Sequence, residues 1–280
     1  MNALNADLHC HSTASDGLLA PAALVARAAA NGVDLLALTD HDELAGVAEA
    51  AAAARSAGIG FLGGVEVSVS WGDDQTVHII GLGVDPAAPD LAGGLAKVRA
   101  GRDGRAARMA SELERIGFHG ALAGALRHAG NPRLVSRSHF ARFLVEAGAS
   151  RTVHEVFDHF LARGKPGYVS HQWASLAEAV GWIRAAGGLA VIAHPCRYRL
   201  SDAQREQLYG AFRDLGGEGL EVVSGAGFPD DVLAAARAAR RFGFLASRAS
   251  DFHGPEESPV DLGRAPHLPA DLVPVWSRLI

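Results

Sequence analysis

Residues 33–42 read VDLLALTDHD, an apolar run that ends in polar and ionisable side chains. A continuous apolar run of this length is typical of a strand buried on both faces, as in parallel sheets. Upstream, residues 4–11 (LNADLHCH) place Asp7, His9 and His11 on one face and apolar side chains on the other, which predicts another strand. Between these strands, Pro21 opens a helix and the Asn-Gly pair at 31–32 closes it.

The alternation of strands and helices continues along most of the chain. Further strands are expected at residues 59–67, 76–83, 189–193, 220–223 and 244–247, and further helices at residues 44–57, 175–186, 202–215 and 230–242. Repeated strand–helix units with buried strands imply a parallel sheet. The sequence therefore predicts an α/β fold in which seven strands close into a barrel.

Residues 89–165 break this alternation, because they have the pattern of helices with basic residues and contain no convincing strand. We interpret them as a helical insertion in a barrel loop, with the barrel formed by residues 1–88 and 166–280. The insertion holds 13 Lys or Arg and 7 Asp or Glu, a net charge of +6. Since the whole chain carries −5, the barrel carries −11. The insertion is therefore expected to be a basic cap over an acidic barrel.

Composition narrows the class of protein. A chain of 280 residues with 49% hydrophobic side chains can bury a large core. Its two cysteines do not make a disulfide framework, which favours a reducing compartment. The N-terminus lacks the basic and apolar regions of a secretion signal, and no run of about 18 apolar residues suggests a membrane span. We expect a cytoplasmic protein, and the sequence indicates no protein partner.

Histidines and carboxylates gather where the expected strands end. They are His9, His11, Asp16, His41, Glu66, His78, His194, Asp251 and His253. Taken alone, a residue such as His41 or His78 is an ordinary core or surface histidine, and Glu66 is a paired buried acid. Five strand ends carry such groups together, however, and catalytic residues of (β/α) barrels lie at the carboxyl ends of the strands. Histidine with carboxylate suits Zn²⁺, Mn²⁺ or Fe²⁺, and the absence of a thiolate cluster argues against a structural zinc site.

Four motifs resemble those of the PHP (polymerase and histidinol phosphatase) superfamily. They are Asp7-Leu8-His9-Cys10-His11-Ser12, Thr39-Asp40-His41-Asp42, Gly64-Val65-Glu66 and Ser250-Asp251-Phe252-His253. The segment from Arg137-Ser138-His139 to Gly164-Lys165-Pro166 is similar to the stand-alone bacterial group typified by the TrpH and YciV proteins. That group includes 3',5'-nucleoside bisphosphate phosphatases and 5'-to-3' exoribonucleases.

The resemblance implies a distorted (β/α)7 barrel with a trinuclear metal site. It assigns His9, His11, Glu66 and Asp251 to one metal, Glu66, His78 and His194 to a second, and Asp16, His41 and His253 to a third. It further implies that Asp7 and Asp40 orient the imidazoles. We expect two or three Mn²⁺ ions, with Zn²⁺, Fe²⁺ and Mg²⁺ as alternatives. His194, His253 and Asp251 are also the expected catalytic residues.

The basic insertion favours a phosphorylated substrate, because an arginine fork matches phosphate oxygens. The residues expected to bind it are Arg99, Arg102, Arg137, His139 and Lys165. The net charge of the whole chain is negative, and the insertion contains few aromatic residues. Both features argue against extended binding of single-stranded nucleic acid. A small nucleotide fits better, although short RNA stays open.

Together these features imply a phosphomonoesterase that releases the 3'-phosphate of nucleoside 3',5'-bisphosphates. The alternatives within the superfamily are a 5'-to-3' exoribonuclease acting on short 5'-phosphorylated RNA and a histidinol-phosphate phosphatase. A non-catalytic metal-binding module is the alternative of another class. The complete set of ligand-type residues argues against that last possibility.

Overall fold

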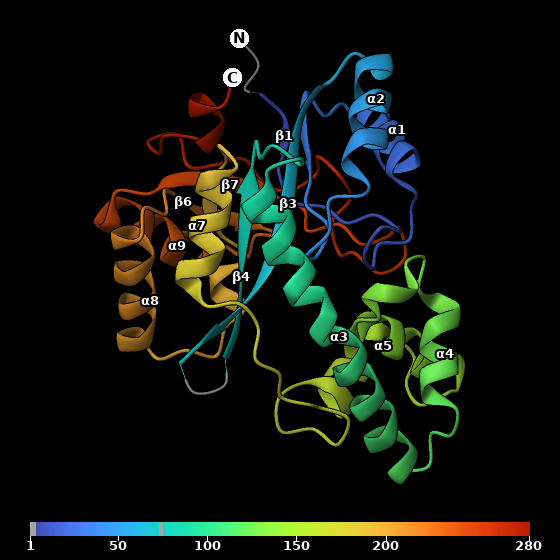
Figure 1. Ribbon diagram of the computed structural model, residues 1–280. Coiled ribbons are helices and arrows are strands. Elements are labelled where there is room, and N and C mark those ends of the chain that lie inside the picture. Colours follow the sequence, from blue (N-terminus) through green and yellow to red (C-terminus); the bar gives the residue numbers. More distant parts are fainter. Residues whose placement is uncertain (1–3, 73–74) are drawn as a thin grey trace.

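The computed structural model describes residues 4–72 and 75–280. Within these residues, seven strands form one sheet in the order β1 to β7. The strands are β1 (Ala6–Asp7), β2 (Leu35–Leu38), β3 (Gly60–Trp71), β4 (Gln75–Leu82), β5 (Leu189–Ile192), β6 (Gly219–Ser224) and β7 (Leu245–Ala249). The fold is a distorted (β/α)7 barrel, as the sequence predicted, and Figure 1 shows the strands at its centre.

The sheet is mixed rather than parallel, so that part of the prediction is wrong. Strand β4 runs antiparallel to both β3 and β5, whereas all other neighbouring strands are parallel. The reason is the short connection: Trp71 at the end of β3 already pairs with Gln75 at the start of β4. A parallel crossover needs a dozen or more residues, whereas a few residues suffice for a hairpin.

Only a few hydrogen bonds close the barrel between β1 and β7. Leu8 N donates to Arg248 O at 3.1 Å, Asp251 N to His9 O at 3.0 Å and His11 N to Phe252 O at 2.8 Å. The strand expected over residues 4–11 is therefore regular only at Ala6–Asp7, and beyond it the chain pairs with the segment after β7. This closure places residues 9–11 beside residues 251–253.

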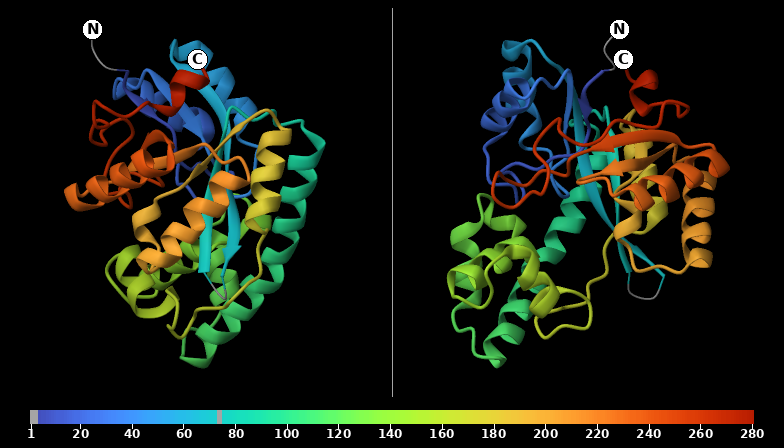
Figure 2. Two further views of the ribbon diagram at one scale, coloured as in Figure 1. Left: turned by 90° about the vertical axis from the view of Figure 1, so that its left-hand side faces the viewer. Right: turned by 180° about the vertical axis from the view of Figure 1, so that it is seen from behind.

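Helices cover the outer face of the barrel (Figures 1 and 2). They are α1 (Pro21–Ala30), α2 (Val47–Ala57), α7 (Leu176–Ala185), α8 (Asp202–Asp214) and α9 (Pro229–Phe242), with short turns η3 (Pro195–Arg197) and η4 (Val275–Arg278). The largest buried cluster lies between strands β3 to β7 and helices α3 (Pro89–Arg115), α7, α8 and α9. None of the described helices has the length and apolar content to cross a membrane.

The expected insertion is helical and has a core of its own. It contains α3 (Pro89–Arg115), α4 (Ala121–His128), η1 (Pro132–Leu134), α5 (Arg137–Glu146), α6 (Val153–Val156) and η2 (Phe157–Leu161). Figure 1 shows α4 and α5 away from the sheet, beside the far end of α3. Leu91 and Leu95 of α3 pack into the barrel core, whereas Met109 and Leu113 pack with α4 and α5. The long helix α3 thus belongs to both bodies and joins them.

Arg248 on β7 is buried and fastens the C-terminal segment to the barrel. Its guanidinium donates to the backbone oxygens of Ala6, Gly263, Ala265 and Pro266. We expect Arg248→Met to lower the free energy of unfolding by about 3–5 kcal/mol, because it leaves several buried acceptors without a donor. Urea denaturation followed by circular dichroism measures this effect.

Arg240→Met is the matched control, since Arg240 forms a bidentate pair with Asp271 at the surface. Exposed ion pairs contribute little to stability. The denaturation midpoint of this variant should stay close to that of the wild type. Equal effects of the two substitutions would contradict the anchoring role of Arg248.

Candidate metal centre and pocket

Four side chains converge at the mouth of the barrel to form a first cluster. His9 and His11 follow β1, and their Nε2 atoms lie 3.0 Å apart. Both Nε2 atoms lie 3.3 Å from Asp251 Oδ1, and they lie 3.3 and 3.4 Å from Glu66 Oε2. Ligand atoms bound at about 2.1 Å to one tetrahedral ion lie roughly 3.4 Å apart. The two imidazoles have this spacing to each other and to each carboxylate oxygen, and His9, His11 and Asp251 form one set of possible ligands to a single cation.

The second oxygen of Glu66 faces a different pair of imidazoles. Glu66 Oε1 lies 2.9 Å from His78 Nδ1 and 3.0 Å from His194 Nε2. His78 reaches this point from the first half of β4, because the antiparallel strand begins at the edge where its neighbours end. His194 follows β5. With its two oxygens directed at two clusters, Glu66 has the arrangement of a bridging ligand.

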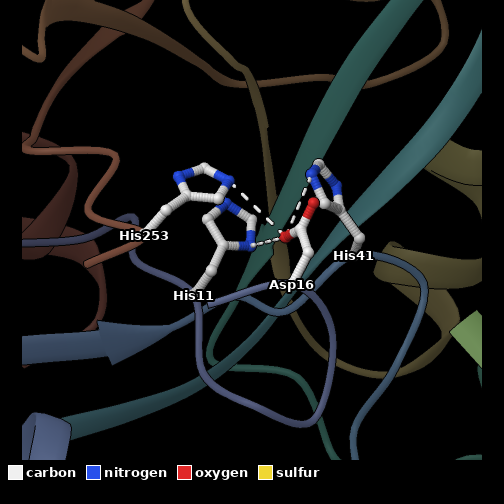
Figure 3. Close-up of side chains that lie close together, drawn as sticks. All are labelled: His11, Asp16, His41 and His253. Atoms are coloured by element: carbon white, nitrogen blue, oxygen red, sulfur yellow. Dashed lines mark ion pairs between the residues drawn. The ribbon is translucent and has the colours of Figure 1, made fainter. Parts of the chain in front are cut away.

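A third cluster surrounds Asp16, and Figure 3 shows three imidazoles directed at its carboxylate. Asp16 Oδ1 lies 3.5 Å from His253 Nε2, 3.8 Å from His41 Nε2 and 4.0 Å from His11 Nδ1. The sequence predicted Asp16, His41 and His253 but did not place His11 here. Because His11 presents Nε2 to the first cluster and Nδ1 to the third, it lies between the two.

Several buried ligand-type atoms in these clusters lack a hydrogen-bond partner. They include His11 Nδ1, Asp16 Oδ1 and Glu66 Oε2. A buried polar atom without a partner costs about 1–3 kcal/mol, and an unpaired buried charge costs more. Divalent cations would satisfy these atoms, and the mixture of imidazole and carboxylate suits them. The side chains present therefore fit a metal centre.

The carboxylates of the centre are held in their ionised form. Burial alone would raise the pKa of Glu66, but His78, His9 and His41 hold this pKa well below its usual value. Burial would likewise raise the pKa of Asp16, and His41 and His253 outweigh it. Both groups thus carry a negative charge at neutral pH, as cation ligands require.

Glu221 is a residue of the site that the sequence analysis missed. It lies on β6, with Oε1 2.7 Å from His9 Nδ1, and Oε2 accepts a hydrogen bond from His194 N at 2.6 Å. It thereby fixes the ring of His9 and the backbone of His194, so it holds two ligands of different clusters. The sequence did contain a signal for this residue, an acid within an otherwise apolar strand. A buried charge of this kind must have a partner.

Asp7 and Asp40 do not orient imidazoles, so that prediction is wrong. Asp7 accepts hydrogen bonds from Ser250 N at 2.9 Å and Gly263 N at 2.8 Å. Asp40 accepts from Ser12 N at 2.7 Å and from the hydroxyls of Ser12 and Ser15 at 2.6 Å. The short aspartate side chains reach donors in the turns beside Asp251 and Asp16. They hold the loops that carry ligands rather than the ligands themselves.

A cavity of about 500 Å³ leads from the clusters to the insertion. The barrel contributes Asp16, His41, Glu66, His78, His194, Asp251 and His253 to its lining, and the insertion contributes Arg102, Arg105, Ser136, Arg137, Phe157 and Arg163. Tyr168 and Trp173, from the segment that returns to the barrel, complete this wall. Metal-type ligands of the barrel and guanidinium groups of the insertion therefore line the same cavity.

The predicted substrate-binding residues divide into two groups. Arg102 and Arg137 line the cavity, and so does Arg105, which follows Arg102 by three residues on α3. Arg99, His139 and Lys165 lie outside the lining. Arg99 instead donates to Asp42 O at 2.7 Å, and His139 Nδ1 accepts from Ser136 N at 3.0 Å as part of a helix cap. The side chain of Lys165 is exposed.

A family described as "PHP domain" matches residues 7–207. The chain belongs to the PHP domain family. This match covers most of the barrel, all of the insertion, and every proposed ligand up to His194. It confirms the resemblance inferred from the four sequence motifs.

Relatives of known name cover nearly the whole chain. A 3',5'-nucleoside bisphosphate phosphatase from Chromobacterium violaceum is 54% identical over 98% of this chain and 96% of its own. A 5'-3' exoribonuclease from Haemophilus influenzae is 40% identical over 97% of this chain and 98% of its own. Among solved structures, an amidohydrolase from Chromobacterium violaceum with bound sulfate is 53% identical, with a TM-score of 0.95 over 98% of this chain and 95% of its own. The chain therefore resembles both phosphatases and ribonucleases of its family.

The bridging arrangement of Glu66 predicts the effect of its removal on metal content. After reconstitution with Mn²⁺, Glu66→Ala should lose more than one equivalent of metal, because its oxygens face two clusters. Elemental analysis of the dialysed protein measures the stoichiometry. Glu178→Ala is the control, since its carboxylate caps α7. A loss of one equivalent or less in Glu66→Ala would contradict the bridge.

Proposed function

We propose that this protein is a metal-dependent phosphatase that removes the 3'-phosphate from nucleoside 3',5'-bisphosphates and leaves a nucleoside 5'-monophosphate. The observation that carries the proposal is a cavity lined both by the metal-type ligands of the barrel and by Arg102, Arg105 and Arg137 of the insertion. Such a cavity offers separate places to two anionic groups of one small molecule. The 54% identity with a 3',5'-nucleoside bisphosphate phosphatase supports this substrate class.

The proposed ligand sets follow the three clusters. His9, His11, Glu66 and Asp251 hold one cation, Glu66, His78 and His194 a second, and Asp16, His41 and His253 a third. We propose Mn²⁺ for these sites, since imidazole and carboxylate ligands suit it. When bound, divalent cations neutralise phosphoryl oxygens and lower the pKa of water.

The protein's own side chains hold and orient the reacting group. His194, His253 and Asp251 line the cavity, and we assign them the catalytic role of ligands beside the phosphate that is cleaved. Arg197 also lines the cavity and forms an ion pair with Asp251. This pair keeps a guanidinium beside the phosphate that is cleaved, where it can offset developing negative charge.

The basic wall is proposed to bind the phosphate that is not cleaved. Arg137 is the best placed, because no carboxylate in the described residues pairs with it, whereas Arg102 pairs with Asp42. Burial lowers the pKa of the Arg137 guanidinium, and an anion beside it would offset that loss of hydration. Arg105 lies over the ring of Trp173 at 5.3 Å from its centroid and adds positive charge to the same wall.

The two cysteines bear on the cellular location. Cys10 and Cys196 are both free thiols, and Cys10 is buried. Free thiols suit a reducing compartment. We therefore propose a cytoplasmic enzyme.

The test compares two substrates that differ only in the 5'-phosphate. Arg137→Ala should lower kcat/KM for adenosine 3',5'-bisphosphate by about 10- to 100-fold, because a charged hydrogen bond contributes about 1.5–3 kcal/mol. The value for adenosine 3'-phosphate should change little, since that substrate has no second phosphate. Phosphate release with added Mn²⁺ provides the measurement.

Arg108→Ala is the control, because Arg108 lies on α3 of the same insertion but is exposed and outside the cavity lining. An equal fall for both substrates would place Arg137 at the reaction centre or in the fold instead. A 5'-phosphorylated RNA oligomer belongs in the same assay. Faster turnover of the oligomer than of the bisphosphate would favour the exoribonuclease activity that the Haemophilus influenzae relative carries in its name.

A further inference from the structure

The three loops that carry Asp16, His41 and His253 all contact the helical insertion. We propose that the insertion, in addition to lining the cavity, assembles this third cation site. The insertion's contacts to the three loops carry the inference, which rests on the proposed metal centre and is independent of the substrate.

The loop with Asp16 lies between the barrel and the insertion. On the barrel side, Asp40 holds Ser12 and Ser15. On the other side, Ser136 Oγ donates to Asp16 Oδ2 at 2.9 Å, and Arg142 Nη2 donates to Asp16 O at 2.5 Å. Because the serine holds Oδ2, the other oxygen, Oδ1, is turned toward the three imidazoles.

The turn that follows His253 is held by the same arginine. Arg142 forms a bidentate pair with Glu257, with both distances at 2.7 Å. Glu257 lies in a turn where the hydroxyl of Ser258 accepts a hydrogen bond from His253 N at 2.7 Å. The guanidinium of Arg142 is buried and joins the Asp16 loop to the His253 turn.

The loop with His41 is held by the first helix of the insertion. Arg99 donates to Asp42 O at 2.7 Å, and Arg102 pairs with the carboxylate of Asp42. Asp42 follows His41 directly and has a φ of +50°, a backbone conformation that non-glycine residues rarely adopt. Such a conformation persists where surrounding contacts hold it, and two of those contacts come from α3.

The ligands of the other two clusters are held by the barrel alone in the described structure. His9 Nδ1 and His194 N contact Glu221, and His78 N donates to the hydroxyl of Tyr198 at 2.8 Å. Asp251 N donates to His9 O. The insertion should therefore affect the third cation most, and the other two only through His11 and His41, which also contact Glu66.

The experiment measures Mn²⁺ binding to the full chain without substrate. Ser136 and Arg142 are positioning residues. We expect Ser136→Ala to lower the affinity for one of the three Mn²⁺ ions by about 10- to 100-fold, as the loss of a hydrogen bond to a metal ligand does. Arg142→Gln should lower the affinity for the same ion. Ser136→Thr keeps the hydroxyl and should therefore keep the wild-type affinity. Isothermal titration and elemental analysis after dialysis give affinity and stoichiometry.

Ser175→Ala is the matched control, because Ser175 forms the same kind of capping box at α7 that Ser136 forms at α5. It should keep all three ions, which separates the loss of a helix cap from the loss of the contact to Asp16. Circular dichroism and retention of the two other ions show that the variants are folded.

Wild-type affinities for all three ions in both Ser136→Ala and Arg142→Gln would overturn the inference, and so would equal weakening of all three. A wild-type chain that binds only two ions would overturn it together with the proposed third site. A chain that behaves as expected in metal binding but releases no phosphate would overturn the proposed function and leave this inference standing.

Discussion

The structure depends on one buried carboxylate that five imidazoles surround. Glu66 is 1% exposed, and ring nitrogens of His9, His11, His41, His78 and His194 lie 2.8–3.4 Å from its oxygens. Burying a carboxylate is costly unless charges and hydrogen bonds compensate it. The five histidines come from four other parts of the barrel, so the compensation exists only when the barrel has closed. The site is therefore complete only in the closed barrel.

The topology of the sheet supplies the imidazoles that this carboxylate needs. The β3–β4 hairpin makes β4 antiparallel, and it thereby brings His78 to the edge where the other strands end. Closure between β1 and β7 brings residues 9–11 beside residues 251–253 through a few backbone hydrogen bonds. Glu221, from β6, then fixes His9 and the backbone of His194. Each departure from a regular parallel barrel places a polar group at the centre.

The insertion opposes the acidic barrel with positive charge, and its arginines act in two ways. Arg105 and Arg137 line the cavity, Arg99 and Arg142 contact the loops of the barrel rim, and Arg102 does both. A guanidinium serves both tasks, because its planar fork binds phosphate and carboxylate oxygens equally well. Sequence position alone does not separate these tasks, since Arg102 and Arg105 lie three residues apart on one helix.

The sequence by itself determined the α/β barrel, and it was enough to propose the helical insertion and the nine metal ligands, because strand patterning places the chemistry at strand ends and the motifs are local. It also contained the signal for Glu221, an acid within an apolar strand. Only the tertiary structure decided that β4 is antiparallel, that His11 lies between two clusters, and that Asp7 and Asp40 hold turns. It also separated cavity arginines from structural ones. These facts depend on which distant donor or charge a side chain meets, and that is fixed only when segments far apart in the sequence pack together.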